Sequence, residues 1–401
     1  MLLLLSLSST NGQFSYTTNA NNTLTITGYT GSGGTVNIPT NINGLTVTGI
    51  GNGKTAVFGS GLTGVIIPNT VTAIAGGTYE GSGYIYGAPF NGCPSLTNVS
   101  ILGNTTIGAY AFYNCSNLTS VYIAGGAIGF EAFWLCVGNW GEPGQPPAPT
   151  NGLSSVTLGN GVTSIGEEAF LSDSFLSNIV IPGSVTNIGV SAFGACSLTN
   201  ATISYGVTTI GDYAFAQNLL TSVYLPGSIV SVGDQAFYDM STLNNVTIAA
   251  GVSSITAGAF QECFSLTNVF CLGNAPAVVG LTGDGPIFLD TQATVYYLPG
   301  TPGWSNTFGW NDGVWGFSGA PTSLWNPIIQ THDGHFGVHS NQFGFNITST
   351  NTIPIVVEAC TNLANPVWTP LTNVMLTNGS YYFSDKQWTN YPTRYYGVGF
   401  P

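Results

Sequence analysis

The chain has 401 residues and a formal net charge of −13, because sixteen Asp and Glu residues outnumber three Lys and Arg residues. Only 5% of the residues are charged, against about 25% in a typical soluble domain, and this shortage of cations argues against binding to nucleic acid or to an anionic membrane. With 43% hydrophobic and 12% aromatic residues, the chain is expected to be ordered and rich in β structure.

The N-terminus reads MLLLLSLSSTNGQF, an apolar run from Leu2 to Leu7 followed by small polar residues. The run resembles a shortened secretory signal, since it lacks a basic region and falls short of the roughly 7 to 15 apolar residues of a complete one. We interpret residues 1–12 as a truncated signal segment, with a disordered tail as the alternative. No apolar run reaches the roughly 20 residues that span a bilayer, so no membrane span is expected.

A phrase ending in Ala-Phe recurs along the middle of the chain. Its copies lie 21 to 23 residues apart, except for one step of 37. They are IGAYAF ending at Phe112, IGFEAF at Phe133, IGEEAF at Phe170, IGVSAF at Phe193, IGDYAF at Phe215, VGDQAF at Phe237, ITAGAF at Phe260 and a degenerate YGAPF at Phe90. Such a period predicts a solenoid in which each coil buries its apolar face against its neighbours.

The long step contains the stretch VGNWGEPGQPPAPTNG at 137–152. Its Pro and Gly residues cannot continue a strand, so we predict an insertion loop that bulges from one coil. The regular period resumes after this stretch, and the insertion therefore leaves the repeat itself intact.

A second phrase, L-x-x-V-x-I, lies between successive phenylalanines, as in LTSVYI at 118–123. Its alternating residues predict a strand, with Val121 and Ile123 in the core and Tyr122 facing outward. A third phrase, such as GVTSIG at 161–166, adds further aliphatic side chains. Each coil thus supplies several aliphatic residues and one phenylalanine to a continuous core.

A glycine follows the isoleucine of the third phrase, and we expect it to permit a tight turn or a positive φ angle. An acidic residue often comes next, as at Glu167, Asp212 and Asp234. A carboxylate there is expected to cap the free N–H groups of a short helical turn at Ala-Phe, which we prefer to a catalytic role.

The three phrases recur in fixed order, as in LTSVYLPGSIVSVGDQAFYDMSTL at 220–243. This order resembles the BspA-type leucine-rich repeat, a bacterial cell-surface variant, over residues 86–276. The resemblance implies a mainly β leucine-rich-repeat solenoid of about eight coils of 22–23 residues, in a secreted or cell-surface adhesion protein. The chain departs from the family pattern at the insertion and in the weak first coil, and the central array keeps the family's proline only at Pro182 and Pro226.

The segments on either side of the array are expected to differ from it. Residues 13–85 resemble an N-terminal β-hairpin cap with a first degenerate coil, and residues 277–319 resemble a terminal coil and cap. Residues 320–401 contain short alternating or aromatic-rich runs, such as FGFNIT at 343–348 and SYYFSD at 380–385. Such runs predict a small β-sandwich-like domain, which resembles the C-terminal domain of many secreted bacterial repeat proteins.

Five of the seven cysteines lie three residues after a repeat phenylalanine. They are Cys93, Cys115, Cys136, Cys196 and Cys263, while Asp173, Asn218 and Met240 take the same place in other coils. This pattern predicts a small buried side chain at one position of each coil, because free cysteine behaves as a small hydrophobic residue. The alternative is a disulfide between neighbouring coils, Cys93 with Cys115 or Cys115 with Cys136.

All three histidines lie in THDGHFGVHSNQFGF at 331–345, together with Asp333. His332, His335 and His339 are ligand types that suit a transition metal. On a strand, however, His335 and His339 would face one side and His332 the other. The spacing matches no known metal signature, so we predict no metal centre and no cofactor and keep the histidines as weak candidates.

The sequence lacks the motifs that are typical of the common enzyme classes. Its acids are scattered, no G-x-S-x-G or H-E-x-x-H motif occurs, and the G-K-T at 53–55 does not belong to a G-x-x-x-x-G-K-[ST] motif. A neutral, hydroxyl-rich solenoid suits binding to an extended partner, so we expect a non-enzymatic extracellular or cell-surface protein that binds a protein or glycan. The alternatives are self-association into a filament or surface layer, and binding to ice or crystal surfaces through Thr163, Thr186 and Thr208.

The expected binding surface is the row of outward residues at the centre of V-x-I. It consists of Ser100, Tyr122, Thr157, Val180, Thr202, Tyr224, Thr247 and Phe270. Stacking at about 4.8 Å per coil would set these residues in a flat, neutral strip whose aromatic rings anchor a ligand. The alternative is that strand propensity alone selects Tyr, Thr and Val at these positions.

Overall fold

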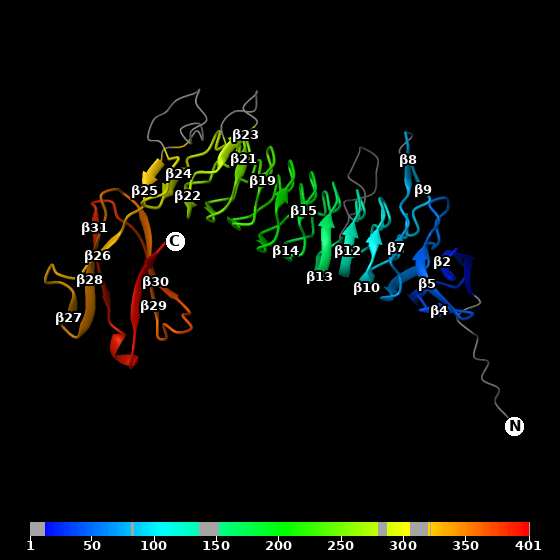
Figure 1. Ribbon diagram of the computed structural model, residues 1–401, viewed down its shortest axis with the longest axis horizontal. Helices are drawn as coiled ribbons and strands as arrows, with labels where there is room; N and C mark the ends of the chain where they lie inside the picture. The colour runs from blue at the N-terminus through cyan, green and yellow to red at the C-terminus, as the bar shows by residue number, and fades with distance from the viewer. Residues whose placement is uncertain are drawn as a thin grey trace.

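The computed structural model describes residues 13–81, 84–134, 136, 152–279, 287–304, 320 and 322–400. The protein is an elongated solenoid of about 11 turns with antiparallel sheets at its C-terminal end (Figure 1). The described residues contain no α-helix. The mainly β solenoid is therefore confirmed, although the predicted number of about eight coils is too low. The expected signal segment, and the insertion up to residue 151, lie outside the described residues.

The V-x-I phrases form one column of parallel strands, here called the V-x-I column. In β18 (Ser222–Leu225) the alternate residues Val223 and Leu225 are buried, as the pattern predicts. The hydrogen-bonded ladder is interrupted between β13 and β14 and between β16 and β18. The other strands of the column are β3 (Gly34–Asn37), β6 (Leu62–Ile67), β10 (Asn98–Asn104), β12 (Ser120–Ile128), β13 (Ser155–Ile165), β14 (Asn178–Ile181), β16 (Asn200–Ile203), β20 (Asn245–Ile248), β22 (Asn268–Cys271), β24 (Thr294–Tyr297) and β25 (Thr322–Leu324).

The third phrase forms a second column of parallel strands, most of them only two or three residues long. Strands β12 and β13 are longer, and each runs through both columns. At their ends β12 pairs with β11 and β13 pairs with β15, which are strands of the second column. The remaining strands of this column are β2 (Thr23–Tyr29), β5 (Leu45–Ile50), β7 (Ala73–Ile74), β11 (Thr106–Ile107), β15 (Asn187–Ile188), β17 (Thr209–Ile210), β19 (Ser231–Val232), β21 (Ser254–Thr256) and β23 (Ala277–Val279). Each coil is thereby joined to the next by both columns, except at the two interruptions of the V-x-I column.

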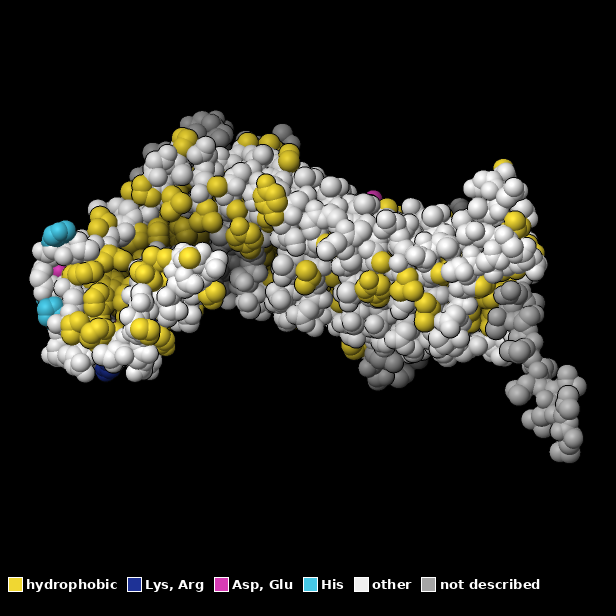
Figure 2. Space-filling model, turned by 60° about the horizontal axis from the view of Figure 1, so that its bottom comes forward, with side chains coloured by type: hydrophobic (Ala, Val, Ile, Leu, Met, Phe, Trp, Pro, Cys, Tyr) yellow, Lys and Arg dark blue, Asp and Glu magenta, His cyan; other side chains and the backbone are white. Residues whose placement is uncertain are grey.

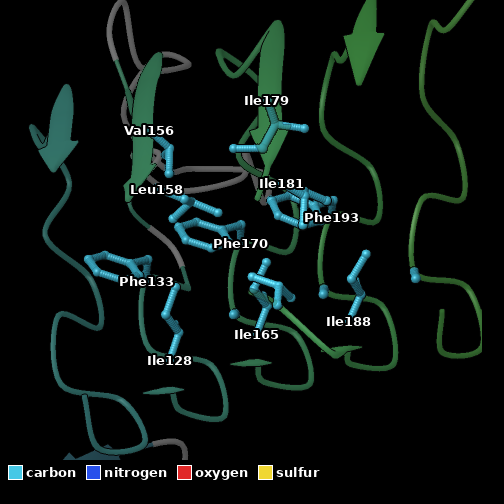
Figure 3. Packing of buried hydrophobic residues seen from close by; sticks show 14 of the residues in the cluster. Ile128, Phe133, Val156, Leu158, Ile165, Phe170, Ile179, Ile181, Ile188 and Phe193 are labelled. Atoms are coloured by element: carbon cyan, nitrogen blue, oxygen red, sulfur yellow. The ribbon is translucent and has the colours of Figure 1, made fainter. Parts of the chain in front are cut away.

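The repeat phenylalanines fill the centre of the solenoid and stack on one another from Phe58 to Phe288. Neighbouring ring centroids lie 4.5 to 5.6 Å apart, with interplanar angles of 3° to 24°. Figure 3 shows Phe133, Phe170 and Phe193 between the aliphatic residues of both strand columns. This stack begins at Phe58, one coil before the first copy of the repeat that the sequence pattern revealed.

The Ala-Phe segments are turns and not the short helical turns that we predicted. In most coils the residue before Ala-Phe is a non-glycine residue with positive φ, for example Tyr110 at 61° and Glu168 at 54°, which a helical turn does not allow. The preceding glycine has a different role from the one expected, since a Cβ on Gly189 would lie 2.5 Å from the backbone nitrogen of Glu167. These glycines are required because adjacent coils approach closely there.

The N-terminal segment combines hairpins with solenoid pairing. Strand β1 (Phe14–Thr18) pairs antiparallel with β2, and β4 (Asn41–Ile42) pairs antiparallel with β5. However, β2 and β5, which carry LTITGY and LTVTGI, pair parallel to each other. The parallel stacking of coils therefore begins within the segment expected to be a hairpin cap. A further hairpin of β8 (Thr78–Glu80) and β9 (Tyr84–Tyr86) projects from the early coils.

The C-terminal region consists of antiparallel sheets that share one hydrophobic cluster, including Phe345 and Phe383 from one sheet and Ile355 and Val357 from the other. The first sheet contains β26 (Ile328–Gln330), β27 (Gly337–His339), β28 (Gln342–Thr348) and β31 (Ser380–Asp385). The second contains β29 (Pro354–Cys360), β30 (Thr369–Met375) and β32 (Tyr395–Gly399), and a short 3-10 helix, η3 (Trp388–Asn390), precedes β32. The division at residues 85, 276 and 319, and the β-sandwich-like domain, stay predictions.

Candidate interaction surface

The outward residues of the V-x-I column stand in register along the solenoid. Strand pairing places Tyr122 beside Thr157, Val180 beside Thr202, and Tyr224 beside Thr247. Most of these side chains are exposed, with Tyr122 at 40%, Val180 at 58% and Tyr224 at 54% of their accessible area. We call Tyr122, Thr157, Val180, Thr202, Tyr224 and Thr247 the strand row, to which Ser100 adds a half-buried neighbour.

Phe270 does not belong to this surface, and the expectation that it is exposed is wrong. Its side chain is fully buried, with its ring centroid 5.5 Å from that of Tyr296 and 4.6 Å from that of Phe400. Phe270 does face away from the solenoid core, as strand alternation requires. The C-terminal region, however, packs over this end of the V-x-I column and covers the side chain.

Polar side chains beside the strand row form hydrogen bonds from one coil to the next. The Thr119 hydroxyl donates to the carbonyl oxygen of Thr97 at 3.0 Å, and the Asn268 amide donates to the Asn245 side chain at 3.0 Å. On the second column, Thr208 donates in the same way to the carbonyl of Thr186 at 2.8 Å. These donor hydrogens point to the preceding coil and not outward, which weakens the case for a threonine array that binds ice.

Charged side chains are rare on the face that Figure 2 presents, as the composition predicts. One of the turn acids has a structural role, since the Asp212 carboxylate accepts a hydrogen bond from the backbone N–H of Asp234 at 2.8 Å. This bond joins two adjacent coils. It therefore stabilises the stack, whereas the capping that we predicted was within one coil.

The column of cysteines is buried, as predicted from its spacing, and all seven cysteines of the chain are free thiols. Cys115 donates its S–H to the carbonyl oxygen of Phe90 at 3.2 Å, and Cys196 donates to Phe170 at 3.2 Å. Burial raises the pKa of both thiols well above the ordinary value. The column position is thus buried in every coil, and most coils fill it with a small side chain that donates a hydrogen bond to a phenylalanine carbonyl.

Asp173 occupies the same column between Cys136 and Cys196 but lacks such a bond. Its side chain is completely buried, and neither carboxyl oxygen has a hydrogen-bond partner. Burial raises the pKa of this carboxyl well above its usual value. Asn218, at the equivalent place, donates to the carbonyls of Phe193 at 2.8 Å and Phe215 at 2.9 Å.

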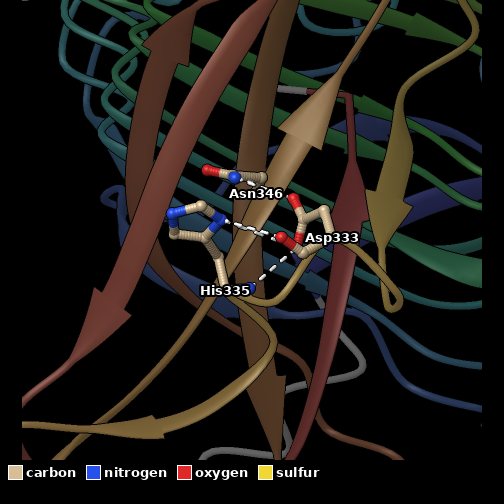
Figure 4. Close-up of polar contacts among 3 residues, drawn as sticks. All are labelled: Asp333, His335 and Asn346. Carbon is tan, nitrogen blue, oxygen red and sulfur yellow. Dashed lines mark hydrogen bonds and ion pairs between the residues drawn. The ribbon is translucent and has the colours of Figure 1, made fainter.

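The histidines lie on the loop before β27 and on β27 itself. Figure 4 shows Asp333 between Asn346, whose amide donates to it at 2.8 Å, and His335, whose backbone N–H donates at 3.0 Å. These two bonds, the Asn346 bond first, lower the pKa of Asp333. His332 instead contacts Thr331. Among the described residues no group of three or more His, Cys, Asp or Glu side chains is placed to hold a metal ion.

One group of residues escaped the sequence analysis. Glu131 is buried on the turn side of the solenoid close to Tyr113, whose ring centroid lies 5.6 Å from that of Trp134. Tyr113 and Trp134 follow Phe112 and Phe133 by one residue, so they occupy equivalent places in successive coils. A comparison of that position from coil to coil would have revealed the two rings. No sequence signal distinguished Glu131 from the other acidic residues of the turns.

No helix in the described part of the chain is long and apolar enough to cross a membrane.

Comparison with known proteins supports the fold through its repeats. A family model for the BspA type leucine rich repeat region matches residues 53–137 and 149–274 in six copies. No curated protein matches the sequence.

Three similar solved structures have low sequence identity to this chain. A leucine rich cell surface protein from Faecalibacterium prausnitzii has 22% identity and a TM-score of 0.32, over 78% of this chain and 93% of that one. A leucine-rich repeat protein from Bacteroides ovatus has 18% identity and a TM-score of 0.37, over 78% and 98%. The pneumococcal vaccine antigen PcpA has 15% identity and a TM-score of 0.37, over 71% and 85%. Because the family model covers more than half of the residues, the chain belongs to the BspA-type leucine-rich repeat family.

Proposed function

We propose that the protein is an extracellular or cell-surface interaction protein that binds a protein or glycan partner through the strand row. The observation that carries this proposal is the exposed, uncharged row itself, in which Tyr122 and Tyr224 stand among Thr and Val. Family membership supports the location, and no residue constellation in the described chain favours catalysis. The adhesion role rests on the family resemblance.

The strand row has a chemistry suited to an extended, uncharged ligand. Four strand steps separate Tyr122 from Tyr224, so a partner that contacts both rings must extend about 19 Å at roughly 4.8 Å per strand. Aromatic rings dominate recognition energy because they bury a large area at low entropic cost, while Thr hydroxyls adapt their hydrogen bonds. A sugar ring offers an apolar face for such stacking, and so does a partner side chain.

The test is a binding screen with the purified chain and a matched set of variants. A glycan and matrix-protein array identifies ligands, and the Tyr122→Ser/Tyr224→Ser variant is then measured on each. We expect binding to be lost while the far-UV circular dichroism is unchanged, because both tyrosines are exposed and exposed substitutions shift stability by only about 0.5 kcal/mol. Tyr205→Ser is the control, since Tyr205 is 78% exposed and lies outside the strand row.

Full binding by the double variant would remove the ligand site from the strand row. Binding lost equally in the Tyr205→Ser control would mean that any exposed tyrosine matters, and the row would have no special role. Native size separates this proposal from a filament subunit, because a monomeric binder elutes at the size of one chain and a polymer elutes in the void volume.

A further inference from the structure

A second surface lies on the turn side of the solenoid, where the coils of Phe112 and Phe133 meet the β8–β9 hairpin. Ile85 of the hairpin is buried in one cluster with Tyr110, and Tyr113 and Phe130 pack against that cluster. We call the following residues the aromatic–acidic patch: Tyr79, Tyr113, Phe130, Glu131, Trp134 and Glu168. Tyr79 is 53% exposed, and Tyr113, Phe130 and Trp134 are half-buried.

The rings in and beneath this patch are tilted, unlike those of the phenylalanine stack. Tyr113 and Trp134 have centroids 5.6 Å apart at 52°, and Tyr110 and Phe130 have centroids 5.4 Å apart at 90°. Tyr110 and Tyr113 lie 6.2 Å apart at 85°. Parallel rings cover one another's faces, whereas in a tilted or edge-to-face pair at most one of the two rings has a face covered by the other. The electron-rich face of an aromatic ring attracts cations.

Glu131 brings a buried carboxyl group to these rings. Only 6% of the residue is exposed, and its Oε2 atom is buried without a hydrogen-bond partner. Its backbone has a positive φ of 47°, which the turn imposes at this place. Burial, then the charges of Glu168 and Glu167, raise the pKa of Glu131 to about 7. A buried carboxylate without a partner is costly unless a cation compensates it.

The described chain supplies no such cation. Its ion pairs join Arg394 to Asp385 at 3.0 Å and His335 to Asp333 at 3.9 Å, both in the C-terminal region. The sequence holds only two other basic residues, Lys54 and Lys386. The described carboxylates are also not grouped for a metal ion. Without a cation, Glu131 avoids the cost of a buried charge by holding its proton. A cation from another molecule would find this carboxylate without a competing partner, and the tilted rings favour an organic cation.

We propose that the aromatic–acidic patch binds the side chain of an arginine or lysine on a partner polypeptide, with Glu131 as its counter-ion and the rings of Tyr113 and Trp134 against its cationic head. The planar guanidinium stacks on aromatic faces and binds a carboxylate through two parallel N–H···O hydrogen bonds. Arginine is therefore the better ligand. This site differs from the strand row in position and in charge, and it does not depend on the function proposed above.

The test uses the full chain and two small probes, Nα-acetyl-arginine methylamide and its uncharged isostere Nα-acetyl-citrulline methylamide. Saturation-transfer difference NMR at pH 8 gives a dissociation constant for each probe. We expect saturable binding of the arginine probe and roughly tenfold weaker binding of the citrulline probe. Glu131→Gln and Tyr113→Leu should each weaken the arginine probe by about the same factor, and Asp239→Asn on the same turn side should leave it unchanged.

Lowering the pH from 8 to 5 should weaken binding of the arginine probe, because protonation of Glu131 removes the counter-ion. The titratable groups facing it are Tyr110 and Tyr113 from the preceding coil and Glu167 and Glu168 from the following coil, and Tyr79 of the hairpin faces the two tyrosines. In Glu131→Gln this loss of affinity between pH 8 and pH 5 should largely disappear.

Three results would overturn the proposal: equal affinity for the citrulline probe, an unchanged dissociation constant in folded Glu131→Gln, or no saturation by the arginine probe. The Tyr122→Ser/Tyr224→Ser variant should bind the arginine probe normally. Failure of the strand row and failure of this patch can therefore be told apart.

Discussion

Replacing Asp173 by asparagine should stabilise the protein at neutral pH. Asp173 is the one acidic residue in a column otherwise filled by thiols, Asn218 and Met240 in the repeat array, and both of its oxygens are buried without partners. A buried polar group without a hydrogen bond costs about 1–3 kcal/mol of folding free energy. Asn218 shows that an amide at this position reaches the carbonyls of two repeat phenylalanines.

The expected gain for Asp173→Asn at pH 7 is therefore about 1–3 kcal/mol in the free energy of unfolding. The amide would reach the carbonyls of Phe133 and Phe170, which are equivalent to the partners of Asn218. Asp173→Cys should stabilise in the same direction, because a thiol is what the neighbouring coils carry. Replacement by alanine is the control that removes the charge but supplies no donor.

The dependence on pH follows from the sign of the pKa shift. Burial raises the pKa of Asp173 in the folded protein, so its contribution to stability is complete below the unfolded pKa of about 4 and is lost as pH rises toward the folded value. The loss is about 1.4 kcal/mol for each pH unit between the two values. Glu131 and Glu168 also have raised pKa values. They change the stability of the unsubstituted protein and of Asp173→Asn by the same amount, so they do not affect the difference.

Urea unfolding followed by circular dichroism at pH 4 to 8 measures this difference. At pH 4 the protonated carboxyl has an O–H group that can donate to a carbonyl as the amide does, so the advantage of Asp173→Asn should be small there and should grow toward pH 8 as the proton is lost. The reasoning is refuted if both proteins lose stability equally with pH, or if the variant is the less stable one at pH 7.

Phe215→Ala should cost about 3–5 kcal/mol, because Phe215 is fully buried between two stacked rings; Phe264→Ala, at a 55% exposed phenylalanine, should change the melting temperature little, and equal shifts would contradict the stack. Gly189→Ala should also destabilise, since its Cβ would lie 2.5 Å from a neighbouring backbone nitrogen, and thermal unfolding of the folded variant checks this. Elemental analysis of the purified protein should find no stoichiometric zinc, copper or nickel, and a metal that is lost in His335→Ala would overturn that expectation.

The central part of the fold could be predicted because its determinants are local and repeated. The alternation in LTSVYL places Val223 and Leu225 in the core, and the period of the phenylalanines predicts their stacking. Each coil contacts mainly its neighbours, so one correctly interpreted coil describes the array. The coil at Phe58 was missed because its surrounding residues lack the Ala-Phe phrase, although its ring stacks on Phe90.

The candidate sites depend on contacts that no local pattern records. Phe270 has the alternation of an exposed residue, yet segments more than 100 residues later in the chain cover it, among them Phe400. Gly189 resembles a turn glycine, whereas the distance between coils is what excludes a side chain. Glu131 resembles a capping acid, and only the placement of three coils and a hairpin shows that its carboxyl is buried without a partner.

The pairing of β12 with β13 has a consequence for how such chains diversify. Val121 pairs with Val156, and Ile128 with Ile165, across the one step of 37 residues, just as other coils pair across steps of 21 to 23. The packing of adjacent coils thus sets the register of the paired strands, and the length of chain between the two strands does not change it. This junction can accept foreign sequence without moving the coils on either side, which makes it the natural place to graft a peptide for display.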